Sequence, residues 1–259
     1  MLIYFFIFIF GLIVGSFLNS VIYRLEQGQS FIKGRSFCPH CKHQLSWQDL
    51  IPVFSFLILK GRCRYCQKKI SWQYPLVEFF TGILFVLIFS RSEGARLAQF
   101  DWAAIFNFII ASFLIVIFVY DLKHYIIPDK VIYPAIVAAF LFRIWNFGNW
   151  DLFGILNLVF GILPSLFFLA IIIFSQGKWM GLGDFKLAVL MGLFLGWPDI
   201  IVALFSAVFL GAIIGIGLII SKEKTLKSEV PFGPFLVFGT FLALFWGGKI
   251  INFYLNLFL

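Results

Sequence analysis

Met180-Gly181-Leu182-Gly183-Asp184-Phe185-Lys186 is the stretch around which this chain is organised, because it sets an aspartate at the edge of a long apolar run. Two glycines precede Asp184, so the backbone is able to bend sharply there and to approach another segment closely. A carboxylate at the edge of a membrane segment is costly to place and is a candidate functional residue by default. The competing interpretation is a solvated loop acid beside Lys186.

A second acid, Asp121, closes the apolar run from Phe113 to Tyr120 and begins the segment Asp121-Leu122-Lys123-His124-Tyr125-Ile126-Ile127-Pro128-Asp129. Two carboxylates at one membrane face can share a proton and activate water. Asp121 ends a predicted helix, where the backbone dipole disfavours a negative charge and favours holding a shared proton. Asp129 follows Pro128 and begins the next helix, where a carboxylate is favoured as a cap. We therefore expect Asp121 to partner Asp184 and Asp129 to be structural.

The composition is that of a polytopic membrane protein. The chain has 259 residues, of which 62% are hydrophobic and only 12% are charged. This is too apolar for a soluble domain of this length. The apolar runs are near 20 residues long, as membrane helices require, whereas barrel strands would be short and alternating. We expect an all-α polytopic membrane fold.

The apolar runs predict about eight transmembrane helices. The first covers residues 2–23, and because Arg24 follows it and nothing charged precedes it, we interpret it as an uncleaved helix and not a signal peptide. The turn Gly196-Trp197-Pro198-Asp199 separates two spans; if it were a kink, the count would be seven. The predicted domains are 1–23 (first helix), 24–73 (polar domain) and 74–259 (membrane-embedded domain). The other seven runs are 75–90, 102–120, 130–147, 152–175, 184–197, 199–220 and 233–257.

The basic residues predict the orientation, since cytoplasmic loops carry an excess of lysine and arginine. With residues 24–73 in the cytoplasm, 16 basic residues lie on that side and 4 on the other, and both termini lie outside. Topology thus explains the net charge of +8, and we expect no nucleic-acid partner. Asp121, Asp129 and Asp184 then share the cytoplasmic face, although the acids played no part in the count. We expect a multi-pass membrane protein with residues 24–73 on the cytoplasmic side.

All four cysteines lie in the polar segment as two C-x-x-C pairs, Cys38-Pro39-His40-Cys41 and Cys63-Arg64-Tyr65-Cys66, separated by 21 residues. This spacing is typical of a metal site. Four thiolates suit tetrahedral Zn²⁺, which would hold together a domain too small to fold well alone. We predict one structural zinc bound by Cys38, Cys41, Cys63 and Cys66. Redox-active or free thiols are the alternative, and His40 or His43 could substitute as ligands.

Together these segments resemble the prepilin peptidases, the type IV leader peptidases of bacterial pilus, type II secretion and competence systems. The resemblance runs through most of the chain, and the order and shared membrane side of the segments make it specific. Beyond the two aspartate segments and the cysteine pairs, the matching segments are Gly15 to Arg24, Trp47 to Pro52, Gly61-Arg62-Cys63, Tyr74-Pro75-Leu76-Val77-Glu78 and Pro231-Phe232-Gly233-Pro234-Phe235.

The resemblance implies a membrane aspartic endopeptidase that removes the basic leader from type IV prepilins or pseudopilins at the cytoplasmic face, with Asp121 and Asp184 as the catalytic pair. It also implies methylation of the new N-terminus with S-adenosylmethionine. The polar segment has no G-x-G-x-x-G, so it is not a Rossmann methyltransferase, and no residues are assigned to the methyl donor. Glu78 either faces the donor site or pairs with Arg24 or Lys69, and we favour the pairing. Asn19 is expected to cap or bridge helices through its side-chain amide, in preference to a catalytic role.

Other functions are compatible with parts of the sequence. An intramembrane protease with other substrates would also use the G-x-G-D segment, and a transporter would use intramembrane carboxylates for cations. The cysteine pairs and the Pro231–Phe235 segment favour the leader peptidase. We also expect membrane lipid as a partner and consider a homodimer. Five glycines within apolar runs are expected to serve helix packing: Gly154, Gly161, Gly211, Gly215 and Gly217.

Overall fold

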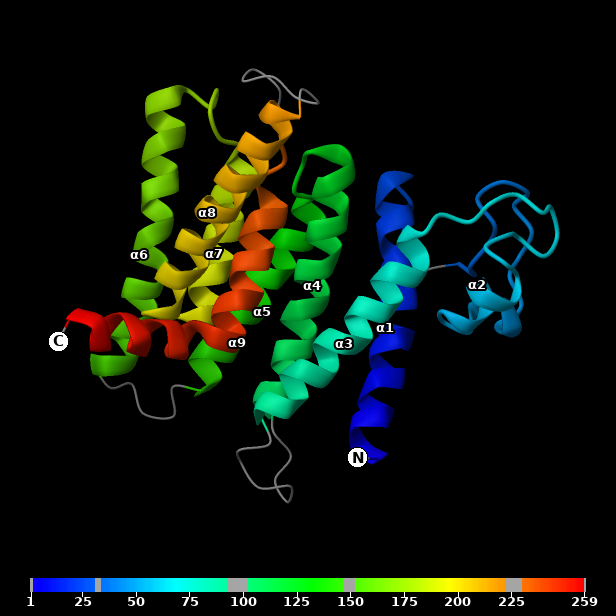
Figure 1. The fold of residues 1–259 in the computed structure, drawn as a ribbon, viewed down its shortest axis with the longest axis horizontal. Coiled ribbons are helices and arrows are strands. Elements are labelled where there is room, and N and C mark those ends of the chain that lie inside the picture. Colours follow the sequence, from blue (N-terminus) through cyan, green and yellow to red (C-terminus); the bar gives the residue numbers. More distant parts are fainter. Residues whose placement is uncertain (1, 31–33, 93–101, 147–151, 222–229, 259) are drawn as a thin grey trace. The chain divides into compact units, whose positions relative to one another are not determined.

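A computed structural model describes residues 2–30, 34–92, 102–146, 152–221 and 230–258. Helices dominate these ranges, and the only strand-like pairing described there is two isolated bridges in the cysteine segment. The predicted all-α fold is confirmed (Figure 1). The elements are α1 (Leu2–Glu26), η1 (Trp47–Leu50), α2 (Phe54–Ile58), α3 (Gln73–Ser92), α4 (Trp102–His124), α5 (Asp129–Asn146), α6 (Leu152–Ser175), α7 (Leu182–Leu195), α8 (Asp199–Ile220) and α9 (Gly233–Phe258).

Six described helices are long and apolar enough to cross a membrane, namely α1, α3, α4, α6, α8 and α9. The multi-pass membrane architecture is therefore confirmed. The 14 residues of α7 extend about 21 Å, less than the roughly 30 Å hydrocarbon core of a bilayer. Helix α5 carries three charged residues, Asp129, Lys130 and Arg143. The predicted total of eight spans stays a prediction. The turn between α7 and α8 does separate two helices, as expected.

The chain divides into two compact units, residues 1–116 and 117–259, with the division inside α4. In the first unit α1 packs along α3. A Cβ atom on Gly15 would lie 2.7 Å from the Cα of Glu78, so only glycine permits this approach of the two helices. Asn19 donates from Nδ2 to the carbonyl of Tyr74 at 3.0 Å. The predicted bridging role of Asn19 is confirmed.

Glu78 links α3 to the cysteine segment through the backbone. Its side chain is buried, and Oε2 accepts a hydrogen bond from the Val53 N–H at 2.7 Å. Val53 has φ 61° and ψ −50°, a strained conformation for a β-branched residue, at the start of α2. The expected pairing of Glu78 with Arg24 or Lys69 is wrong, because the carboxylate holds this strained turn in place.

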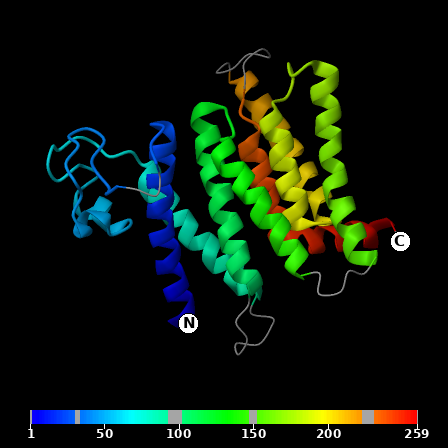
Figure 2. The same cartoon turned by 180° about the vertical axis from the view of Figure 1, so that it is seen from behind.

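Helix α7 is the centre of the second unit, where it packs against α5, α6 and α9 (Figures 1 and 2). Its side chains from Leu187 to Phe194 are mostly buried. A Cβ atom on Gly161 of α6 would lie 2.8 Å from the carbonyl oxygen of Gly192, and a Cβ on Gly192 would overlap the carbonyl oxygen of Gly161. The two backbones therefore touch directly at this glycine pair.

The five glycines expected to serve packing have different surroundings. Gly161 does serve packing, as its contact with Gly192 shows. Gly211 faces the Phe235 ring, but a Cβ placed on it would meet that ring at an ordinary 3.5 Å, so the contact does not require glycine. The expectation is wrong for Gly215 and Gly217, because a Cβ on either would meet nothing within 4 Å among the described residues.

We predict that Gly192→Ala destabilises the second unit by about 1–3 kcal/mol, because the added methyl group forces α6 and α7 apart. Gly215→Ala is the matched control: it adds the same methyl group to open space in α8, and alanine favours helix. Thermal unfolding of the purified proteins in one detergent measures both. Equal unfolding temperatures for the two variants would contradict the packing role of Gly192.

Candidate metal centre and active site

The four cysteines come together in the first unit. Their sulfur atoms all lie within 4.8 Å of one another, with Cys38 Sγ and Cys66 Sγ 3.9 Å apart. A tetrahedral Zn–S bond length of about 2.3 Å sets sulfur atoms about 3.8 Å apart. The cluster therefore fits a single tetrahedral metal ion, and Cys38, Cys41, Cys63 and Cys66 are the residues that would bind it.

The two cysteine pairs have the same backbone structure, a local repeat that sequence analysis did not predict. In each pair the first cysteine donates its N–H to the carbonyl five residues later, at 2.9 Å in both cases. The residue after each second cysteine, Lys42 or Gln67, adopts a left-handed φ of 59° or 58°. Each loop is thus shaped by its own backbone, and a metal ion would join the two loops.

The histidines lie outside this ligand set, which among the described residues consists of the four cysteines. The ring of His43 packs on Tyr65, with centroids 3.7 Å apart, so it joins the first cysteine loop to the second. The alternative in which His40 or His43 replaces a cysteine ligand is not supported by this arrangement.

Asp49 anchors η1 to the second cysteine loop. Its side chain is 4% exposed and accepts hydrogen bonds from Arg64 Nε at 2.8 Å and from Ser46 Oγ at 2.8 Å. Burial alone would raise the pKa of Asp49, but the hydrogen bonds from Ser46, Arg64 and Tyr65 hold it below its usual value. The ionised anchor is therefore present above the ordinary pKa of an aspartate and is lost only as the pH falls through the lower folded-state value.

Asp121 lies in the last turn of α4, which continues to His124 and not only to residue 120 as predicted. The helix ends where the Tyr125 N–H bonds to the Asp121 carbonyl at 2.9 Å and Tyr125 adopts a left-handed φ of 58°. The side chain of Asp121 is buried, with 4% exposed. Its Oδ2 atom has no hydrogen-bond partner within the described part of the chain. A buried, unsatisfied carboxylate oxygen is unusual and calls for a functional explanation.

Asp184 lies in the first turn of α7, and its N–H bonds to the carbonyl of the N-cap residue Gly181 at 3.2 Å. Neither glycine of the segment adopts a left-handed φ. A Cβ on Gly183 would lie 3.1 Å from Cβ of Ile127, so glycine allows α7 to approach the segment between α4 and α5. The expected close approach is confirmed, and a sharp bend is not needed.

The second unit brings the two acids close enough that the charge of Asp121 acts on Asp184. One carboxylate comes from the end of a helix and the other from the beginning of a helix, so both are held on regular backbone. Like charges at such a site favour a state in which the pair binds one proton. The catalytic role of this pair is not tested by the geometry and stays a prediction.

Gly233 is a site residue for which sequence analysis assigned no role. It is the first residue of α9, and a Cβ placed on it would lie 2.5 Å from Asp121 Oδ2 and 3.1 Å from Asp121 Cγ. The absence of a side chain is therefore what leaves room for the Asp121 carboxylate. The signal was present in the sequence as a glycine between two prolines at the start of an apolar run.

Asp129 has a partner other than Asp184. It lies in the first turn of α5, as expected, and its Oδ1 accepts a hydrogen bond from Lys186 Nζ at 2.6 Å. Lys186 also lies over the Tyr133 ring, 4.7 Å from the centroid. The pair joins α5 to α7, and the Asp129 side chain is 62% exposed. The structural role of Asp129 is therefore better described as an ion pair with Lys186 than as a helix cap.

Two family models match the chain. The bacterial peptidase A24 N-terminal domain matches residues 9–92, and the type IV leader peptidase family matches residues 108–216. Relatives named prepilin leader peptidase/N-methyltransferase align over nearly the whole chain. The protein from Aeromonas hydrophila is 32% identical over 98% of this chain and 94% of its own length.

The chain belongs to the type IV leader peptidase family. The Bacillus subtilis relative of the same name is 35% identical over 97% of both chains, and the Legionella pneumophila relative is 32% identical over 96% of this chain and 93% of its own. No solved structure matches the chain. The first family match contains the four cysteines and the second contains Asp121 and Asp184, whereas Gly233 lies beyond both.

We predict about one zinc per chain, because four thiolates complete one tetrahedral site. Elemental analysis of the purified protein measures the content. Cys63→Ser should lower it sharply and loosen the cysteine segment more than the membrane helices. His43→Gln should keep the zinc, since His43 contacts Tyr65 and not the sulfur cluster. Absence of zinc together with free alkylation of all four thiols in the folded protein would contradict the site.

We predict that Gly233→Ala lowers peptidase activity about 100-fold, because the methyl group displaces the Asp121 carboxylate and a shift of about 1 Å costs this much. Gly248→Ala is the control on the same helix, where an added Cβ meets nothing within 4 Å. The two variants should express alike. A Gly233→Ala protein that is as active as Gly248→Ala would show that the carboxylate position is not set by Gly233.

Proposed function

We propose that this protein is a membrane aspartic endopeptidase that removes the basic leader from type IV prepilins or pseudopilins and then methylates the new N-terminus. The observation that carries the proposal is the pair of acids at the ends of α4 and α7, one of them buried with an unpaired oxygen. Membership of the type IV leader peptidase family and the names of the relatives support the same activity.

The chemistry follows from two carboxylates that share one proton. The ionised acid takes a proton from water as the water attacks the scissile carbonyl, and the protonated acid donates a hydrogen bond to the carbonyl oxygen. The proton then passes to the leaving amine, and no covalent bond to the enzyme forms. Asp121 and Asp184 fit these roles because both are held on helix backbone within one compact unit.

The substrate requires the site at the cytoplasmic face, where a basic leader remains while its apolar helix lies in the bilayer. The excess of lysine and arginine in the loops on the side of the two acids supports this orientation. Residues 24–73 then lie in the cytoplasm and both termini outside. In that reducing compartment the four cysteines are kept as thiols able to bind zinc, which serves the fold and takes no part in peptide hydrolysis.

S-adenosylmethionine is the methyl donor that the family implies, and when bound it supplies the methyl group for the new N-terminal amine. The residues that bind it are not assigned. The two activities are separable in this proposal, because the carboxylate pair acts only in hydrolysis.

We predict that Asp121→Asn and Asp184→Asn each reduce prepilin cleavage by at least about 100-fold, the usual contribution of a general acid or base. Expression and zinc content should be unchanged. Asp129→Asn is the matched control, because it removes a third acid whose partner is Lys186. It should retain substantial cleavage and lose no more than about 1 kcal/mol of stability, since an exposed ion pair contributes little.

The assay is cleavage of a purified prepilin in detergent by the three variants. Full cleavage by Asp184→Asn would end the aspartic mechanism. Cleavage by Asp121→Asn with none by Asp129→Asn would exchange the roles of these two acids. Loss of cleavage on chelation, with the cysteine segment still folded, would indicate a metalloprotease.

A further inference from the structure

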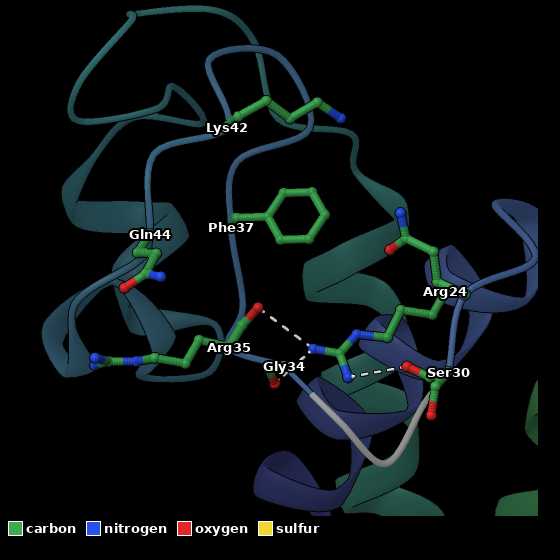
Figure 3. A pocket seen from close by; sticks show the side chains of 8 residues that line it. Arg24, Ser30, Gly34, Arg35, Phe37, Lys42 and Gln44 are labelled. Atoms are coloured by element: carbon green, nitrogen blue, oxygen red, sulfur yellow. Dashed lines mark hydrogen bonds between the residues drawn. The ribbon is translucent and has the colours of Figure 1, made fainter.

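A cavity of about 490 Å³ lies within the first unit, where the end of α1 meets the first cysteine loop (Figure 3). Three basic residues line it, and none of the described residues in its lining is acidic. Glutamine amides and one aromatic ring complete the wall. The residues used below are Arg24, Arg35, Phe37, Lys42 and Gln44.

Arg24 forms a fixed cationic wall of this cavity. It lies in the last turn of α1 and is 8% exposed. Its Nη2 donates to the carbonyls of Gly34 at 2.8 Å and Arg35 at 3.3 Å, and its Nη1 donates to the carbonyl of Ser30 at 3.4 Å. These bonds hold the guanidinium in one position, so this side of the cavity is already organised for a ligand.

Lys42 supplies a second cation from the cysteine loop. Its Nζ lies 5.2 Å from the centroid of the Phe37 ring, within the range of a cation–π contact. Figure 3 shows the Phe37 ring between Lys42 and Arg24, while the Arg35 side chain extends toward Gln44. The cavity therefore offers cations on two sides of an aromatic surface, and one of them is exposed and accessible.

The cavity adjoins the end of a helix that could cross a membrane. Arg24 is in the last turn of a membrane-span candidate, Leu2–Glu26, so the cavity begins where the apolar part of α1 ends. Basic pockets at this level on the cytoplasmic side attract anionic lipid. The same segment exposes Trp47, Phe54, Leu57 and Ile58, and exposed apolar groups of this kind mark interaction surfaces, including membrane surfaces.

Charge distinguishes between the available ligands. S-adenosylmethionine carries a sulfonium and an ammonium group against one carboxylate, so it is a net cation, and a basic leader is cationic too. Both are disfavoured beside Arg24 and Lys42. We propose that this cavity binds the phosphate headgroup of an anionic phospholipid, with the phosphate at the exposed Lys42, the fixed charge of Arg24 on the opposite side of the Phe37 ring, and the headgroup hydroxyls near the glutamine amides. The proposal does not depend on the peptidase activity.

The test titrates the full-length protein, with its metal bound and in an uncharged detergent, with phosphatidylglycerol, and it detects the bound lipid by native mass spectrometry. Lys42→Gln should weaken binding about fivefold and Lys42→Glu about 30-fold, while Lys42→Arg should keep it. The Gln variant is compatible with the backbone, because Gln67 has the equivalent φ in the second cysteine loop. Lys68→Gln and Lys68→Glu are matched controls in that second loop and should change binding less than twofold.

Four results would overturn the proposal. If the Lys68 variants weaken lipid binding as much as the Lys42 variants do, the lipid is attracted by the general positive charge of the segment and not bound at this cavity. If phosphatidylcholine of the same chain length binds as tightly as phosphatidylglycerol, the cavity does not select a net negative charge on the lipid. Inorganic phosphate that competes at the affinity of the lipid would identify a free-anion site. S-adenosylmethionine that binds wild-type protein and is weakened by Lys42→Gln would assign the cavity to the methyl donor.

Discussion

The burial of a carboxylate beside apolar helices is the constraint on which the second unit depends. Asp121 is buried and one of its oxygens has no partner in the described part of the chain, an arrangement that costs free energy in any fold. Two glycines leave space for this arrangement. Gly233 leaves room for the carboxylate itself, and Gly183 lets the start of α7 approach Ile127. The free-energy cost of burying the Asp121 carboxylate is thus offset by packing contacts among several helices.

The position of each acid in its helix sets whether a negative charge is favoured there. Asp184 begins α7 and Asp129 begins α5, positions where a negative charge is favoured, whereas Asp121 lies at the end of α4, where it is not. Asp129 is exposed and paired with Lys186, so its charge is compensated. Asp121 and Asp184 instead act on each other. The three aspartates of the second unit therefore have different surroundings, and we expect only Asp121 and Asp184 to share a proton.

The cysteine segment follows a different principle, because it has little apolar surface to bury. Two loops of identical backbone structure are each closed by their own hydrogen bonds, and the sulfur cluster joins them. Asp49 and the contact between His43 and Tyr65 reinforce that junction. Glu78 then connects the segment to α3 through the N–H of Val53. The hydrophobic core of a polar domain of this size is too small to stabilise the fold by itself. A cluster of four sulfur atoms that fits one metal ion, together with buried polar contacts, supplies the remaining stabilisation.

The sequence by itself determined the helical membrane architecture, the four cysteines that cluster and the two candidate acids, because these depend on local signals: the length of apolar runs, the spacing of C-x-x-C pairs and the placement of charged residues at the ends of apolar runs. Only the tertiary structure decided the partners. Glu78 contacts the backbone of Val53 and not a basic side chain, Asp129 pairs with Lys186, and Gly233 faces Asp121. These contacts join residues between 25 and 112 positions apart in the chain, and no periodicity or spacing encodes them. They arise when whole helices pack, which also explains why Gly161 is essential to a helix contact while Gly215 has open space around it.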